Sequence, residues 1–127
     1  MTSLPVARSD TLRLGPDPRR VIVKPFLPGD HVLFDGRSRI EVVIGRVLAM
    51  TEEGVYETLH ATRSDFADRH RGFDDVLEGN FDLVARRFRV PEDLSAGRRL
   101  LIGAYFTHEY AVEGAALGNP SIVVAPD

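Results

Sequence analysis

The residues with the greatest capacity for chemistry lie close together near the end of the sequence. His108 and Glu109 begin the stretch His-Glu-Tyr-Ala-Val, which resembles the start of the zinc-binding helix motif His-Glu-x-x-His. That motif needs a second imidazole one helical turn after the first, and position 112 is Val112. We therefore expect no metal at this position and no cofactor bound by this chain.

Two carboxylates in the same stretch could act as an acid and a base. Glu109 and Glu113 are four residues apart, so they share one face if the segment is helical. A small enzyme that uses His108, Glu109 and Glu113 is one hypothesis. The alternative is that both carboxylates are solvated or bonded to arginines, and that His108 is a hydrogen-bonded core or interface residue. We favour this non-catalytic interpretation.

Charge is distributed unevenly along the chain, whose net charge is −3 at pH 7. Acidic residues outnumber basic ones between Thr51 and Asp82, which predicts an acidic face. Basic residues then cluster at Arg86, Arg87, Arg89, Arg98 and Arg99. These arginines could meet phosphates, but we favour a solvated or subunit-facing surface. Without a glycine-rich phosphate loop or a strongly basic balance, the sequence predicts no binding of nucleic acid.

The composition also limits where the protein works. The chain has no cysteine, which excludes disulfide bonds, thiolate metal sites and cysteine nucleophiles. The first residues lack the basic start and apolar block of a secretory signal. The most apolar stretch, residues 100–117, contains two glutamates and a histidine, so it does not read as a membrane span. We expect a cytoplasmic protein that does not bind membranes.

Local signals predict where helices and strands begin. An extended arm is expected at residues 1–19 and a helical domain at residues 20–117, with a short β-strand near residues 20–26. Ser38 lies three residues before Glu41, the spacing of a capping box at a helix start. Further helix starts are expected near Thr51, Gly72 and Ser95.

The fourth predicted helix differs from the first three. It is expected to run from Leu100 through Ala116, and it is apolar almost all round. Such a helix is normally the central member of a bundle, with amphipathic helices packed against it. The expected fold is therefore mainly α, a four-helix bundle-like segment with short β-strands near residues 20–26 and 121–125.

The end of the chain resembles a known enzyme family. The stretch RRLLIGAYFTHEYAVEGAALGNPSIVVAPD, residues 98–127, resembles the junction in glycoside hydrolase family 130, the β-mannoside phosphorylases and related mannosidases. At that junction a helical N-terminal extension enters a five-bladed β-propeller. The segments DPRRVIVKPFLPGD and RHRGFDDVLEGNFDLVARRF resemble the extension itself, so the similarity covers nearly the whole chain. Its most specific portions are Y-F-T-H-E-Y and N-P-S-I-V.

The resemblance implies which parts of such an enzyme this sequence contains. The propeller, with its catalytic aspartate and phosphate-binding basic residues, is absent, and residues 118–127 would be the incomplete start of its first strand. Asn119 matches a family position that binds sugar beside the scissile bond, although Gly118 stands where the family has a bulky aromatic. Asn119 is equally well explained as a helix C-cap before Pro120. Four more residues are expected at an interface or bordering the site: Tyr105, His108, Glu109 and Tyr110.

Two functions from different classes follow from these observations. The first is a non-catalytic N-terminal region of a mannoside phosphorylase or glycosidase, inactive alone, which serves subunit assembly and borders a sugar site. Its expected partners are a β-propeller or other subunits in a homo-oligomer, with mannoside and inorganic phosphate as substrates of the complete enzyme. The alternative is a free-standing helical module that binds another protein through its acidic face or its C-terminal strand.

Overall fold

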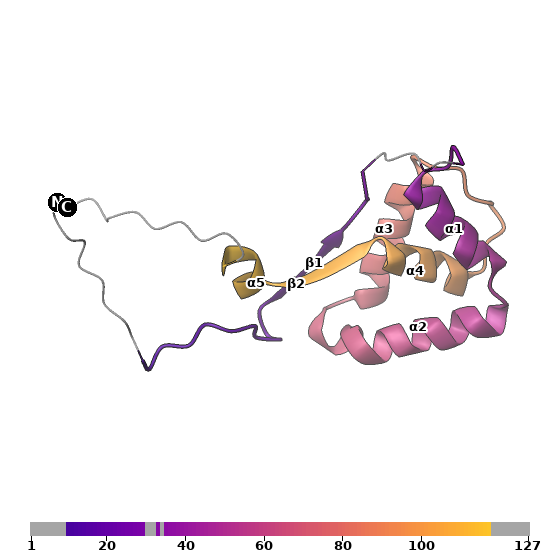
Figure 1. Ribbon diagram of the computed structural model, residues 1–127. Helices are drawn as coiled ribbons and strands as arrows, with labels where there is room; N and C mark the ends of the chain where they lie inside the picture. The colour runs from indigo at the N-terminus through magenta and orange to yellow at the C-terminus, as the bar shows by residue number, and fades with distance from the viewer. Residues whose placement is uncertain (1–9, 30–32, 34, 118–127) are drawn as a thin grey trace, which may run out of the picture.

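The computed structural model describes residues 10–29, 33 and 35–117, and this part of the chain is mainly helical. The helices α1 to α4 form one body, and the strands β1 and β2 form a two-stranded antiparallel ribbon that projects from it and ends at α5 (Figure 1). The elements are, in order, β1 (Val21–Pro25), α1 (Arg39–Ala49), α2 (Glu52–Phe66), the short 3-10 helix η1 (Ala67–Arg69), α3 (Phe73–Ala85), α4 (Ala96–Tyr105), β2 (Thr107–Ala111) and α5 (Val112–Leu117).

Hydroxyl caps mark three of the helix starts, as the sequence predicted. Ser38, Thr51 and Ser95 precede α1, α2 and α4, and each side chain accepts a hydrogen bond from the backbone N–H three residues later. At Ser38 the capping box is complete, because the Glu41 carboxylate accepts from the Ser38 N–H at 2.7 Å. Gly72 separates η1 from α3 in the left-handed conformation, with φ 57°, which glycine adopts at little cost.

Helix α4 packs against α1, α2 and α3. Leu101 and Ile102 are almost completely buried in it. Gly103 allows α3 to approach closely, because a Cβ atom there would collide with the carbonyl oxygen of Leu77. The largest cluster of buried apolar residues comprises Ile40, Ile44, Val47, Val55, Phe81, Val84, Leu101, Ile102 and Phe106.

The prediction of one helix from residue 100 to residue 116 is wrong. Helix α4 ends at Tyr105, residues 107–111 form strand β2, and a separate short helix begins at Val112. An apolar run does not by itself distinguish a helix from a buried strand. Here β1 needs a partner strand, and residues 107–111 provide it through tertiary pairing, which overrides the helical periodicity.

The ribbon has a fixed register, with Val21 opposite Ala111 and Pro25 opposite Thr107. Backbone bonds close both ends: the Phe26 N–H donates to the Phe106 carbonyl at 2.8 Å, and the Val112 N–H donates to the Arg20 carbonyl at 3.0 Å. The strand predicted near residues 20–26 is confirmed. The strand predicted near residues 121–125 lies outside the described residues.

Two aromatic residues lie at the margins of the helical body. Phe88 packs against the main core from the loop after α3, which ends at Ala85. Phe66, the last residue of α2, is 37% exposed. Within residues 10–29, 33 and 35–117, no helix is long and apolar enough to cross a membrane.

Candidate interaction surface on the ribbon

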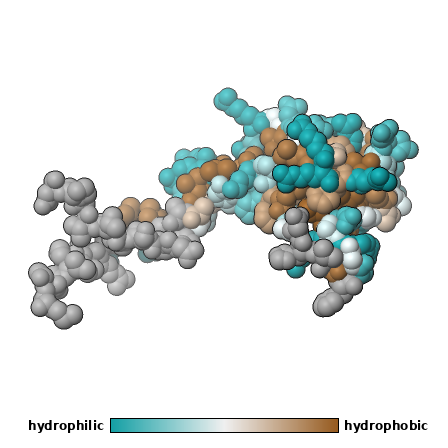
Figure 2. Space-filling view, turned by 90° about the horizontal axis from the view of Figure 1, so that it is seen from above, coloured by the Kyte–Doolittle hydropathy of each residue, from teal (hydrophilic) through white to brown (hydrophobic). Residues whose placement is uncertain are grey.

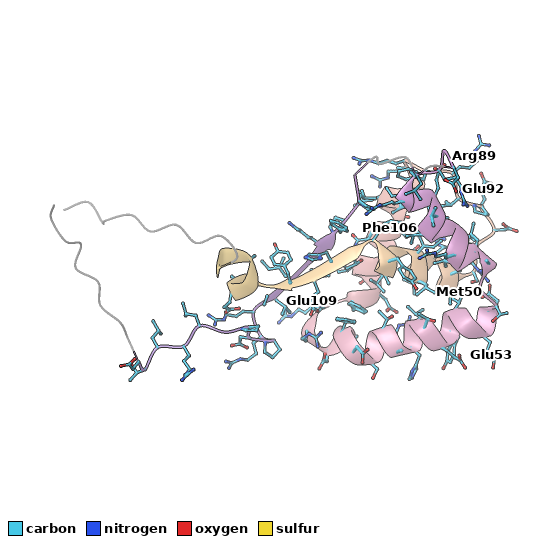
Figure 3. All side chains as sticks on the ribbon, in the orientation of Figure 1. Met50, Glu53, Arg89, Glu92, Phe106 and Glu109 are labelled. Atoms are coloured by element: carbon cyan, nitrogen blue, oxygen red, sulfur yellow. The ribbon has the colours of Figure 1, made fainter. Side chains whose placement is uncertain are left out.

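The ribbon divides the predicted site residues between its two faces. Because side chains alternate along a strand, His108 and Tyr110 project from one face of β2 and Glu109 from the other. Tyr105, at the end of α4, is 53% exposed. Asn119 lies outside the described residues, so its expected sugar contact stays a prediction. The Glu109 side of the ribbon lies toward α2 and α3 (Figure 3).

Glu109 joins the ribbon to the helical body through two side chains. Its Oε1 accepts from Nη2 of Arg69 at 3.0 Å, and its Oε2 lies 2.5 Å from Nε2 of His70. The Glu109 side chain is 19% exposed and that of His70 only 6%. His70 also stacks on Phe73, with ring centres 5.9 Å apart. This junction therefore combines an ion pair with an aromatic contact in a partly desolvated place.

The surroundings of Glu109 control its ionisation. Burial opposes the charged form, but the hydrogen bonds from Arg69 and His70 outweigh it and hold the pKa of the carboxyl below its usual range. A carboxyl with a lowered pKa is ionised at neutral pH and is poorly suited to act as a general acid. Glu109 is therefore placed to hold the ribbon rather than to transfer protons.

Glu113 does not share a helical face with Glu109, so that expectation is wrong. Glu109 lies in β2 and Glu113 in α5, because the helix that would have aligned them is interrupted. The buried carboxylate of Glu113 instead lies 2.5 Å from Nη2 of Arg20, which precedes β1. Each carboxylate is paired with an arginine, which was the alternative to catalysis for these two residues.

His108 belongs to an exposed aromatic face of the ribbon rather than to the core. Its ring lies 5.3 Å from that of Tyr110 and 5.8 Å from that of Phe26, measured between ring centres. Lys24, opposite His108 in the register, places its Nζ 5.2 Å from the centre of the Tyr110 ring. Phe26 and Ile22 are 55% and 41% exposed. The expectation of a core histidine is wrong, and an interface role for this face stays a prediction.

Apolar surface continues along the ribbon between the helical body and α5, with hydrophilic residues beside it (Figure 2). We name the exposed face made by Ile22, Lys24, Phe26, His108 and Tyr110 the aromatic face. Aromatic side chains are enriched at the centres of protein interfaces, and a lysine beside a tyrosine ring adds a cation–π contact. The residue types of the aromatic face are therefore those that are common in protein interfaces.

A groove lies on the opposite side, between the ribbon and the helices, with a volume of about 370 Å³. Its apolar lining comprises Val23, Phe66, Phe73, Leu77, Leu101 and Ala104. Its polar lining comprises Thr58, Thr62, His70, Tyr105, Thr107, His108 and Glu109, so His108 borders this groove as well as the aromatic face. Its size falls in the range of ligand pockets, and its lining favours apolar groups with a polar contact at one end.

The predicted basic cluster does not form one surface. Arg98 turns inward and donates to the carbonyls of Val47 (2.6 Å) and Met50 (3.0 Å) at the end of α1, and it also pairs with Glu52. Arg99 pairs with Glu78 of α3. The remaining three, Arg86, Arg87 and Arg89, are exposed.

Sequence reasoning missed Arg69 and His70 as partners of Glu109. They are 40 and 39 residues from it, and neither forms a local motif with it. Among the residues that the structure describes, no group of histidines and carboxylates could hold a metal ion.

No family model matches this chain, and no curated protein and no solved structure matches it either.

Proposed function

We propose that this chain is the non-catalytic N-terminal region of a β-mannoside phosphorylase or glycosidase-like protein, which serves subunit assembly and borders a sugar site. The observation that carries the proposal is the projecting ribbon with its exposed aromatic face. His108 and Tyr110, which make much of that face, belong to the Y-F-T-H-E-Y portion that resembles the junction with a propeller. Within that portion Tyr105 and His108 are exposed, whereas Phe106 is buried in the core.

In this proposal each part of the chain has a separate role. The four packed helices act as a bundle-like platform, and the ion pairs of Glu109 orient the ribbon on it. The aromatic face contacts the propeller, while Tyr105 and Asn119 border the sugar. Mannoside and inorganic phosphate are bound by the complete enzyme. We place that enzyme in the cytoplasm, where a chain without cysteine is common.

A free-standing interaction module is the second candidate, because the same aromatic face would also suit another protein partner. A small enzyme is not favoured by the geometry. His108 lies on the face opposite Glu109, and both Glu109 and Glu113 are held by arginines. The two binding candidates differ in the identity of the partner, and this difference can be measured.

The test is titration of the purified chain with the propeller of a related enzyme that lacks its own N-terminal extension. We expect binding by calorimetry, and a loss of at least tenfold in affinity for the double variant His108→Ala and Tyr110→Ala. Tyr56→Ala is the matched control, since Tyr56 is 67% exposed on α2, away from the ribbon. The chain alone should not cleave mannosides, with or without phosphate.

Two results would remove the proposal. One is turnover of mannosides by the pure chain. The other is the absence of binding to the propeller, or binding that the ribbon and control variants weaken equally. Stable binding to an unrelated protein through the same two side chains, without binding to the propeller, would establish the interaction module instead.

A further inference from the structure

The two outer edges of the ribbon differ in the backbone groups that they carry. In the observed register every second residue of each strand bonds to the other strand, and the residues between them direct their N–H and C=O groups outward. On the β2 edge these residues are Thr107, Glu109 and Ala111. The β1 edge includes Pro25, which has no N–H group. Only the β2 edge is therefore an uninterrupted row of donors and acceptors.

The outward groups of β2 are unpaired within residues 10–29, 33 and 35–117, where their N–H and C=O groups make no hydrogen bond. The ribbon projects from the helical body, and its outer half lies between that body and α5 (Figure 1). Helix α5 turns back toward the aromatic face, where Gly114 and Ala115 border a shallow hollow together with Lys24 and Tyr110. The outer half of the β2 edge is therefore free to meet another strand.

The β2 edge also lacks the features that normally prevent pairing. Edge strands in native proteins are commonly protected by a proline, an unpaired charge or a bulge. Pro25 gives this protection to β1, whereas β2 has no proline and pairs with β1 without a bulge. Its one carboxylate, that of Glu109, is already bound to Arg69 and His70. A two-stranded ribbon with one such unprotected edge is typical of a sheet that gains further strands.

A second copy of the same strand satisfies this edge. An antiparallel edge is complementary to itself, because each outward residue has one N–H and one C=O, and a twofold axis brings the same groups of both copies together. The β1 edge cannot supply a matching row, since Pro25 interrupts it. In the described part of the chain, β2 is thus the one complete strand edge that is available to pair with β2.

Side chains select the register of this pairing. Centring it on Glu109 would place two carboxylates directly opposite each other, which is unfavourable. Centring it on His108 would bring the end of β2 against residue 105 of the second copy, which belongs to α4. Centring it on Tyr110 places Glu109 opposite Ala111 and brings the two tyrosines together at a pair where side chains approach most closely. It also keeps the two helical bodies apart.

We propose that two copies of this chain pair through the outer edges of their β2 strands, with Tyr110 of each copy opposite Tyr110 of the other. Glu109 of one copy and Ala111 of the other exchange backbone hydrogen bonds. The result is a four-stranded antiparallel sheet in the order β1-β2-β2-β1, in which the two aromatic faces lie side by side on one surface. Because the seam is short, the dimer is expected to dissociate on dilution.

This inference deepens the assembly role in the proposed function, and it rests on that function by naming the contact between two subunits. The pairing requires no propeller, so the two proposals can fail separately. A dimer of the chain that does not bind a propeller removes the proposed function alone. A chain that binds the propeller but never forms the dimer removes this inference alone.

The first experiment is light scattering of the full chain alone over a range of concentrations. We expect the mass to rise from one chain to two, and to stay at one chain in the variant Ala111→Pro, which loses an outward N–H. Val23→Pro is the matched control, because it removes an outward N–H from the opposite edge and should still dimerise. Both substitutions leave the hydrogen bonds between β1 and β2 in place. A wild-type monomer at every concentration, or equal effects of the two prolines, overturns the inference.

The second experiment reads the register, and it needs no other substitution because the chain has no cysteine. Tyr110→Cys should oxidise to a disulfide-linked dimer, since directly opposite residues of such a pair lie within disulfide reach. His108→Cys is the control on the same face of the same strand. In this register the two introduced thiols at position 108 lie four residues apart along the strands, about 13 Å, and should not link. Equal linkage of the two variants, or linkage at position 108 alone, overturns the assignment.

Hydrogen exchange tests the wild-type chain without any substitution. In a single chain the amides of Glu109 and Val23 both face no partner strand and exchange equally fast. At concentrations where the mass is that of two chains, the Glu109 amide should slow by about tenfold or more, while that of Val23 stays unchanged. Slowing of both amides together, or of neither, contradicts pairing through the β2 edge.

Discussion

At the scale of single residues, Glu109 holds together parts of the chain that are far apart in sequence. Its two oxygens contact Arg69 and His70, so one carboxylate determines how the ribbon leaves the helical body. Thr107 makes a second connection between the ribbon and the helices. Its hydroxyl donates to the Gly103 carbonyl of α4 at 2.7 Å and accepts from the Asn80 side chain of α3. The junction is therefore polar, although it borders an apolar groove.

The substitution Glu109→Gln should lower the free energy of unfolding by about 1–3 kcal/mol near neutral pH, because it replaces charge-assisted hydrogen bonds with neutral ones. The pKa of Glu109 in the folded chain is lowered from the usual value of 4.5. Its stabilisation is therefore fully present above that value and is lost as the pH falls through the lower folded pKa. The wild-type advantage should shrink in urea unfolding series carried from pH 7 to pH 3.

The control for this experiment is Glu53→Gln, which removes an exposed carboxylate in the first turn of α2. It should change the stability of the chain by a few tenths of a kcal/mol at most. A difference between wild type and Glu109→Gln that stays constant from pH 7 to pH 3 would contradict the role assigned to the Glu109 charge.

Arg98 of α4 likewise connects distant parts of the chain, because it contacts the end of α1 and the start of α2. Its guanidinium donates to the carbonyls of Val47, Leu48 and Met50, which the end of α1 leaves without helical partners. The substitution Arg98→Ala should lower the free energy of unfolding by about 2–3 kcal/mol, since several buried acceptors lose a charged donor. Arg86→Ala, at an exposed position, is the control and should stay within about 0.5 kcal/mol of wild type in urea unfolding.

At the scale of elements, the contact between α3 and α4 depends on one glycine. Gly103→Ala would drive its methyl group into the Leu77 carbonyl, so the two helices must separate. We expect a loss of about 3 kcal/mol or more in thermal unfolding, in line with overpacking at a site where backbone meets backbone. Gly79→Ala in α3 is the control, because a Cβ there meets nothing within 4 Å. It should stabilise the chain by about 0.5–1 kcal/mol through helix propensity. Equal effects of the two substitutions would contradict this packing.

At the scale of the whole molecule, the body and the ribbon should differ in how readily they open. Helix α4 lies within the main core, whereas the ribbon has only two strands and an exposed aromatic face. Hydrogen exchange should therefore be slowest at amides of α4 and faster at the paired amides of the ribbon, such as Ile22, His108 and Tyr110. The outward amides of Val23 and Glu109, which face no partner strand in this register, should exchange fastest.

A ribbon as strongly protected as α4 would show that the two unfold as one unit. In that case the backbone pairing of the two strands would not be enough to explain the protection of the ribbon. The ion pairs of Glu109 would also have to keep the ribbon closed for as long as the helical body stays folded. The variant Glu109→Gln separates the two cases, because it should then lower ribbon protection more than protection of α4.

The sequence alone determined the features that depend on near neighbours. Ser38, Thr51 and Ser95 predicted three helix starts correctly, because a cap bonds a backbone group only three residues away. The strand at Val21–Pro25 was also foreseen from β-branched residues and the turn that follows. In each case the free energy that decides the structure comes from contacts within one short window.

Only the tertiary structure decided the features that depend on distant partners. Residues 107–111 are compatible with a helix, and they became a strand because β1, near the other end of the chain, pairs with them. That change moved His108 to an exposed face, separated Glu109 from Glu113, and brought Glu109 to His70, 39 residues away. No pattern in a single sequence encodes such a pairing locally, because its free energy is gained only when the folded chain brings the two strands together.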